Sequence, residues 1–180
     1  EREREELVKI LLCIFDIVEL TLNDISNFIN GFGFKSSHSN DNFENNKIIK
    51  ITNLKSDGSL DINNADTFSK SEYSNDLEKY RILENDILIA MSGSLGKLSF
   101  VKDTYNNKNL YLNQRVGIIR PNKNILNNKF LFYLLQNQII KWVKLNTNNS
   151  VLGNINTENI KSINIILPKL EVQNKIAYVL

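Results

Sequence analysis

Two short polar segments hold the residues of this 180-residue sequence that are best suited to recognise another molecule. They are Ser92-Gly93-Ser94-Leu95-Gly96-Lys97 and Asn113-Gln114-Arg115. A Ser/Gly turn presents backbone N–H groups that hold phosphates, and a neighbouring lysine adds positive charge. Asparagine and glutamine form paired hydrogen bonds with adenine, and arginine does so with guanine. The sequence therefore predicts that both segments face a nucleic acid.

Three apolar runs are placed to hold these two segments. The runs are residues 87–91, 98–101 and 115–119, and Gly, Ser and Asn residues separate them. Runs of four to eight apolar residues with such boundaries predict buried strands. The Ser/Gly segment would then join the first two strands, and the other polar segment would lead into the third. The alternative is that Asn113 and Gln114 are buried amides that bridge backbone groups between strands.

The rest of the sequence predicts both helices and strands. Apolar residues recur at helical spacing in residues 1–18 and again after Asn127 or Asn128, either of which can cap a long helix. We further expect strands at residues 18–22, 47–54 and 163–167, and a hairpin turn at Asp57-Gly58. Helical segments are expected as a single turn at 23–28, a weak helix at 71–81 and a helix from 171 to 180. The predicted fold is a single mixed α+β domain with a twisted β-sheet and packed helices, and both ends of the chain are helical.

Charge is unevenly distributed along the chain, although the net charge is only +2. Residues 1–100 hold 11 Lys/Arg against 17 Asp/Glu, whereas residues 101–180 hold 11 against 3. This basic excess predicts a polyanion as the partner of the second half. The alternative is a biased codon composition, since Asn and Ile are also abundant, but such a bias does not explain why acidic residues become rare.

The residue types of several catalytic sites are missing. A phosphate-binding P-loop needs Gly and Ser or Thr where this chain has Met91 and Leu98. The only histidine is His38, the only cysteine is Cys13, and the sequence contains no Glu-x-Lys or Asp-x-Lys pair of the nuclease type. It also lacks the Asn- or Asp-Pro-Pro segment of an adenine methyltransferase. We therefore expect a binding module with no catalytic residue, no metal site and no cofactor.

The composition also predicts the cellular setting. No apolar run reaches the roughly 18 residues that span a bilayer, and the charged first residues do not resemble a signal peptide. A lone cysteine forms no internal disulfide, which fits a reducing compartment. A soluble, cytoplasmic protein is expected.

Several segments occur in a characteristic order. They are Leu22-Asn23-Asp24-Ile25, Ile51-Thr52-Asn53-Leu54, Asp86 to Ser94, Gly96-Lys97, Leu112 to Val116, Phe130 to Leu135, Gly153-Asn154-Ile155 and Leu167 to Ile176. In this order and spacing the chain resembles a target recognition domain from the specificity subunit of type I restriction-modification systems. The resemblance implies a recognition domain at residues 18–169, a helical stub of spacer at 1–17 and the start of a spacer helix at 170–180.

The same resemblance implies a non-catalytic subunit that reads double-stranded DNA and directs adenine methylation and cleavage by other chains. The expected partners are DNA, methyltransferase (modification) subunits, a restriction subunit and a second recognition domain, with which a half-length subunit would pair. Two rival interpretations remain open. One is the recognition piece of a single-chain restriction enzyme and methyltransferase. The other is a protein-interaction module whose helical ends mediate assembly without nucleic acid.

Further candidate DNA contacts lie in polar loops and at separate lysines, where positive charge attracts phosphates. They are Lys35, Ser36, Ser37, Lys55, Asn149, Ser150 and Asn154, in addition to Ser92, Ser94, Lys97, Asn113, Gln114 and Arg115. Residues shared among domains that read different targets are more plausibly scaffold or backbone contacts. The polar loops 36–46 and 146–150 therefore compete with Asn113 to Arg115 as the base-reading segments.

Overall fold

The protein has a mixed α+β fold, as predicted, but its strands form three sheets instead of one. The computed structural model describes residues 17–35, 46–74, 76–105, 109–147 and 155–179. The largest sheet is antiparallel, in the order β2 (Ser26–Asn30), β8 (Val116–Pro121), β5 (Ile87–Ala90) and β6 (Leu98–Phe100). A three-stranded sheet has the order β4 (Asp66–Thr67), β3 (Asn46–Ile49) and β7 (Asn109–Leu112), and β1 (Val18–Thr21) pairs with β9 (Asn164–Leu167).

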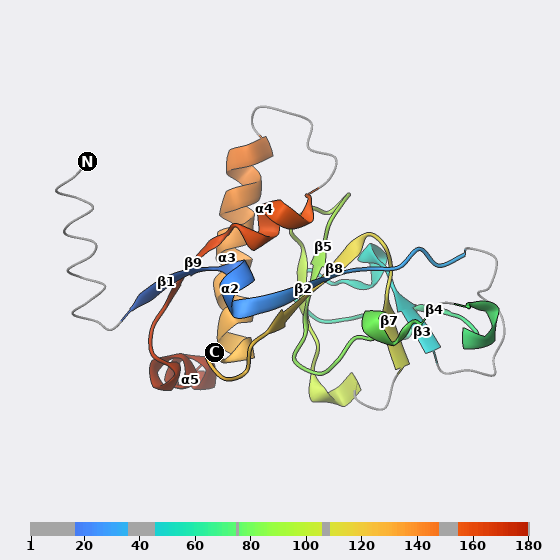
Figure 1. Cartoon of the computed structure of the whole chain (residues 1–180), viewed down its shortest axis with the longest axis horizontal. Helices are drawn as coiled ribbons and strands as arrows, with labels where there is room; N and C mark the ends of the chain where they lie inside the picture. The colour runs from blue at the N-terminus through green and yellow to red at the C-terminus, as the bar shows by residue number, and fades with distance from the viewer. Residues whose placement is uncertain (1–16, 36–45, 75, 106–108, 148–154, 180) are drawn as a thin grey trace.

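Four α-helices are present in the described residues: α2 (Leu22–Ile25), α3 (Asn128–Thr147), α4 (Thr157–Lys161) and α5 (Leu170–Val179). Short 3-10 turns occur at Ile51–Asn53, Lys70–Glu72, Glu78–Tyr80 and Asp103–Tyr105. Figure 1 shows the long helix α3 standing beside the four-stranded sheet, with α5 crossing near its lower end. The three-stranded sheet lies on the other side of the four-stranded one, away from α3 (Figure 1).

The four-stranded sheet is the middle layer of the molecule. Ile87 and Ile89 of β5 pack in the core that contains α3, whereas Leu88 and Ala90 pack in the core shared with the three-stranded sheet. Successive side chains of a strand point to opposite faces, so a strand between two layers must be apolar at every position. Burial on both faces explains why β5 is an unbroken apolar run, as the sequence predicted. Packing on both faces also makes the ends of β5 a rigid base for the loops that follow.

Helix α3 begins as the sequence predicts. The Asn127 side-chain Oδ1 accepts a hydrogen bond from the Phe130 N–H at 3.0 Å, which caps the first turn. Leu131, Leu135 and Ile139 then place one stripe of the helix in the core. The helix beginning at Leu170, the strands at β1 and β9, and the hairpin turn at Asp57-Gly58 are likewise confirmed.

The helical turn expected at residues 23–28 is wrong in its bounds. The Thr21 N–H and hydroxyl both donate to the Asp24 carboxylate, at 2.8 and 2.6 Å, so the helix starts at Leu22 with Thr21 as its N-cap. These two bonds hold the pKa of Asp24 below its usual value. The Ser26 hydroxyl then donates to the Leu22 carbonyl, and Phe28 lies in β2, paired with Ile119. A short helix thus gives way to a strand after one turn.

Two other expectations, for residues 47–54 and 71–81, are also corrected. The strand β3 stops at Ile49, because the Asn53 side chain accepts from the Lys50 N–H at 2.8 Å and closes a 3-10 turn. Residues 71–81 form two separate 3-10 turns instead of one weak helix. Asparagine and serine side chains compete with the backbone for such bonds, which shortens regular elements.

The sequence interpretation missed β7 and α4. β7 was not predicted because its apolar part is only three residues long, although Leu110, Tyr111 and Leu112 are all fully buried. Its parallel pairing with β3 supplies the neighbour that burial requires. Helix α4 is a single turn capped by Asn156, whose side chain accepts from the Asn159 N–H at 2.8 Å.

A buried ion pair fixes β8 to the chain before β5. Arg120 of β8 donates from Nε to one Asp86 carboxylate oxygen at 2.8 Å and from Nη2 to the other at 2.7 Å. Nη2 also donates to the Arg81 carbonyl at 3.0 Å, and Asp86 accepts from the Leu83 N–H at 2.8 Å. Only 2% of the Asp86 side chain is exposed, so the carboxylate depends on these donors.

Candidate nucleic-acid interface

The segment Asn113-Gln114-Arg115 is a tight turn that crosses from one sheet to another. It follows β7 of the three-stranded sheet and leads into β8 of the four-stranded sheet. The Asn113 N–H donates to the Ile49 carbonyl at 3.1 Å, and the Val116 N–H donates to the Asn113 carbonyl at 2.9 Å. The backbone is thereby fixed, while the Gln114 and Arg115 side chains are exposed and Asn113 is half-buried. The prediction that this segment is a loop between strands is confirmed.

The Ser/Gly segment forms a second fixed loop, between β5 and β6. The Gly96 N–H donates to the Ala90 carbonyl at 3.1 Å, and the Ala90 N–H donates to the Lys97 carbonyl at 2.9 Å. Gly96 has φ of 73°, and a Cβ there would lie 2.6 Å from Ile139 Cγ2 of α3. Only glycine fits this position, because it combines a left-handed backbone with close packing. The loop is therefore held against α3.

The outer part of the same loop is open. Gly93 and Ser94 are exposed, and nothing lies within 4 Å of the position that a Gly93 Cβ would take. Ser92 differs from them, because it is 9% exposed and its hydroxyl has no hydrogen-bond partner among the described residues. Lys97 is half-buried. Ser94, the backbone around Gly93 and the half-buried Lys97, which lines the groove beside α3, are thus the accessible polar groups of this loop.

The two loops lie side by side at one end of the four-stranded sheet. Ala90 pairs with Val116, and the Met91 N–H donates to the Arg115 carbonyl at 3.0 Å. The Met91 carbonyl in turn accepts from the Ile155 N–H at 2.8 Å, which brings the segment before α4 to the same place. Antiparallel pairing of β5 with β8 makes this meeting obligatory, because the end of one strand faces the start of the other.

A further segment, residues 31–33, supports the Asn113 turn from β2. The Phe32 N–H donates to the Leu112 carbonyl at 2.9 Å, and a Cβ on Gly31 would lie 2.0 Å from the Asn113 carbonyl oxygen. A Cβ on Gly33 would lie 3.0 Å from the Gln114 side-chain oxygen. We call the assembly of Gly31 to Gly33, Met91 to Lys97, Asn113 to Arg115 and Ile155 to Thr157 the loop edge.

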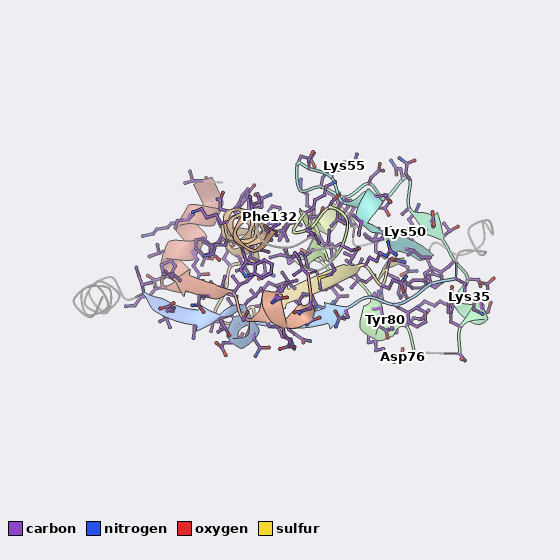
Figure 2. All side chains as sticks on the ribbon, turned by 90° about the horizontal axis from the view of Figure 1, so that it is seen from above. Lys35, Lys50, Lys55, Asp76, Tyr80 and Phe132 are labelled. Carbon is purple, nitrogen blue, oxygen red and sulfur yellow. The ribbon has the colours of Figure 1, made fainter. Side chains whose placement is uncertain are left out.

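The predicted lysines lie in different places. Figure 2 shows Lys35 at one end of the molecule and Lys55 at its upper margin. The Lys35 backbone N–H donates to the Tyr73 hydroxyl at 3.1 Å, and its side chain is exposed. Lys55 is exposed too, with its ammonium 3.9 Å from the Asp61 carboxylate. Of the other candidates, Ser36, Ser37, Asn149, Ser150 and Asn154 lie outside the described residues.

A groove of about 580 Å³ extends from the loop edge along α3. Its lining residues are Ser56, Ser94, Leu95, Gly96, Lys97, Leu98, Gln136, Asn137 and Ile140. The sequence interpretation missed Gln136 and Asn137, because they were seen only as the polar positions of an amphipathic helix. No local sequence signal separates them from the other polar positions of the helix, because their place in the groove follows from the packing of Gly96 against Ile139.

The strand that leads into the Asn113 turn is anchored by a polar cluster. The fully buried Tyr111 donates its hydroxyl hydrogen to Glu78 at 3.1 Å, and Lys70 donates to the same carboxylate at 2.6 Å. The Lys70 hydrogen bond lowers the pKa of Glu78, and the same bond raises the pKa of Lys70. Burial raises the pKa of the Tyr111 phenol. β7 is thus tied at its centre, two residues before the turn at Asn113 to Arg115.

Among the residues that the structure describes, no group of three His, Cys, Asp or Glu side chains is arranged to hold a metal ion. None of the helices in the described part of the chain combines the length and apolar character needed to cross a membrane. The only histidine, His38, lies outside the described residues.

The fold is the mixed α+β fold found in a specificity subunit of known structure. The HsdS subunit from Thermoanaerobacter tengcongensis matches this structure with a TM-score of 0.64 at 16% sequence identity, over 91% of this chain and 36% of that chain. At this level of identity, the match concerns the fold.

Sequence comparison then gives the family. The chain belongs to the family described as the type I restriction modification DNA specificity domain, whose model matches residues 16–180. The EcoBI specificity subunit of Escherichia coli is 24% identical over 131 residues, and the putative MjaX specificity subunit of Methanocaldococcus jannaschii is 33% identical over 114. The aligned parts cover 72% and 58% of this chain, but only 27% and 25% of those relatives. This chain thus spans about a quarter of their length.

Proposed function

We propose that this domain recognises a specific sequence in double-stranded DNA, as part of a specificity subunit that has no catalytic activity of its own. The observation that carries the proposal is the loop edge: exposed Gln114 and Arg115 stand on a backbone fixed by hydrogen bonds, beside the exposed loop at Gly93 and Ser94. Base reading needs donors and acceptors held in fixed directions, and phosphate contacts need accessible positive or N–H groups. Family membership supports the same role.

The chemistry divides between the two loops. Arg115 suits the O6 and N7 atoms of guanine, and Gln114 suits the N6 and N7 atoms of adenine, in the major groove. Lys97 and the backbone N–H groups at Gly93 and Ser94 suit phosphates, which set register but do not distinguish bases. The groove beside α3 extends this phosphate-binding side with Gln136.

The proposed partners follow from the family. Adenine methylation and cleavage would be carried out by modification and restriction subunits in the cytoplasm, with this chain supplying target choice. Helix α5 (Leu170–Val179) would take part in this assembly, because its side chains Val172, Ile176 and Val179 are 44%, 39% and 84% exposed. Positions i, i+4 and i+7 lie on one face of a helix, where they suit a partner helix.

Fluorescence anisotropy with labelled duplexes tests the proposal. A set of duplexes of equal length and varied sequence is titrated at several salt concentrations. A specific DNA reader binds one member more tightly than the others, and its affinity falls steeply as salt rises. Equal affinity for all duplexes, or none at low salt, would favour the protein-interaction alternative.

The substitution Lys97→Ala is expected to weaken binding to all duplexes by a similar factor. The side chain would contact a phosphate, so the slope of log affinity against log salt concentration becomes shallower by about 1. Lys123→Ala is the matched control, since Lys123 is an exposed lysine beyond Pro121, at the opposite end of β8 from the loop edge. A slope unchanged in Lys97→Ala, or equally changed in both variants, contradicts the assignment.

The substitution Arg115→Ala is expected to relax discrimination at one base pair. Losing a bidentate contact with guanine costs about 1–3 kcal/mol of preference at that position and leaves preferences elsewhere intact. The measurement is competition among duplexes that each differ at one position. Arg115→Lys serves as a second variant, because it retains the charge but not the fork of donors. Loss of affinity with unchanged discrimination would make Arg115 a phosphate contact.

A further inference from the structure

The junction between α5 and the rest of the molecule is built around one buried amide. Gln173 lies in α5 and is only 1% exposed. Its Nε2 donates to the Pro168 carbonyl at 2.9 Å and to the Ile125 carbonyl at 3.2 Å. Its Oε1 accepts from the Asn127 N–H at 3.0 Å. A single side chain therefore binds the end of β9, the link after β8 and the start of α3.

Two further bonds lie beside this amide. The Asn127 side-chain amide donates to the Asn174 side-chain oxygen at 2.9 Å in an exposed position. The Lys129 ammonium donates to the Ala177 carbonyl at 3.0 Å, near the last turn of α5. Asn127 also caps α3, so the start of that helix and the course of α5 are fixed by the same residue. The bonds are spread along α5 from Gln173 to Ala177.

Apolar packing alone would leave the direction of α5 poorly defined. The only buried residues of this helix are Gln173 and Ala177, and the neighbouring face exposes Val172 and Ile176. Contact through one small apolar side chain is non-directional and tolerates rotation and sliding. Hydrogen bonds to a buried amide are directional, and a donor or acceptor left unpaired inside is costly. The orientation of α5 must therefore come mainly from Gln173.

We propose that Gln173 is a positioning residue that fixes the direction of α5 relative to the sheets. The inference goes beyond the proposed function and does not require DNA binding. If the proposed function holds, a helix partner that docks on Val172 and Ile176 is oriented relative to the loop edge by this amide.

Pulsed electron paramagnetic resonance distances between spin labels test the proposal directly. Cys13 is first replaced by serine, so that labels attach only at introduced cysteines. One label pair, Thr52→Cys with Tyr178→Cys, spans the sheets and α5, and both positions are exposed. A second pair, Thr52→Cys with Asn137→Cys, lies within the body and reports whether the fold is intact.

The variant Gln173→Met retains volume but loses all three amide bonds. We expect the distance distribution between positions 52 and 178 to broaden and shift, while the distribution within the body stays narrow. Asn174→Ala is the matched control on the same helix, and it should leave both distributions unchanged, since its bond is exposed. A distribution for Gln173→Met as narrow as that of the unsubstituted chain overturns the proposal.

If Gln173→Met also broadens the distance distribution within the body, the variant Gln173→Glu decides whether Gln173 positions α5 or maintains the whole fold. It retains an oxygen for the Asn127 N–H but offers no donor to the Pro168 and Ile125 carbonyls while ionised. Broadening confined to the pair that includes position 178 supports the proposal. Broadening of the body pair in both variants overturns it, because Gln173 then maintains the whole fold instead of the direction of one helix.

Discussion

Replacing Asp86 by alanine is expected to lower the free energy of unfolding by about 3–5 kcal/mol. The substitution removes both oxygens that accept from Arg120, whose side chain is only 30% exposed. Of the hydrogen bonds described for its guanidinium, only the one to the Arg81 carbonyl remains. The Leu83 N–H loses its acceptor as well. A buried charge without its partner is far more costly than the net gain from forming the pair, so the effect is large.

Urea denaturation monitored by circular dichroism measures this change. Glu158→Ala is the matched control, because it also breaks an ion pair, with Lys161, but 81% of the Glu158 side chain is exposed. That control is expected to cost less than about 1 kcal/mol. Equal stability of the two variants would show that Asp86 is not required to hold β8 against the chain that precedes β5.

The second large effect is expected for Gly31→Ala, because Gly31 packs against the turn at Asn113 to Arg115. The new Cβ would lie 2.0 Å from the Asn113 carbonyl oxygen and 2.4 Å from its carbon, both backbone atoms. The backbone at Asn113 cannot rotate away from the new methyl group as a flexible side chain can, so the turn at Asn113 must shift. We expect a loss of stability of about 3 kcal/mol, at the upper end of the range for overpacking.

Gly33→Ala provides a close comparison two residues away. Its Cβ would meet only the side-chain oxygen of Gln114, at 3.0 Å, and that side chain can rotate. Stability should therefore change little. For DNA, Gly31→Ala should lose the discrimination proposed for both Gln114 and Arg115, because the turn that carries them is displaced. Gly33→Ala moves only the Gln114 side chain and should retain the discrimination proposed for Arg115. Unfolding curves and duplex competition measure the two effects, and similar behaviour of the two variants would contradict the assigned role of Gly31.

The strands around the loop edge were predictable because their physical signal is local. Ile87 to Ala90 is apolar at every position, and Asn113 to Arg115 interrupts the next apolar run. A strand buried on both faces is recognised from a few consecutive apolar residues, and a loop is recognised from the polar residues that interrupt such a run. The hairpin turn at Asp57-Gly58 and the cap at Asn127 belong to the same kind of local signal.

The missed features depend on contacts between distant segments. β7 is a strand because it pairs in parallel with β3, more than 60 residues earlier by the register of Asn46 with Asn109. Gly31 supports Asn113, and Asn137 lines the groove with Ser94, again across long stretches of sequence. No periodicity within one segment reports such neighbours. The assignment of individual residues to bases or phosphates stays a prediction for the same reason.

The turn from β7 to β8 ties two sheets together at the point where Gln114 and Arg115 project. The spacing of the two sheets is set by side chains such as Leu112 and Val116 in their shared core. A change of volume there would tilt Gln114 and Arg115 without altering either of them. If these side chains read bases as proposed, target preference is open to adjustment from the interior, by substitutions that never touch the nucleic acid.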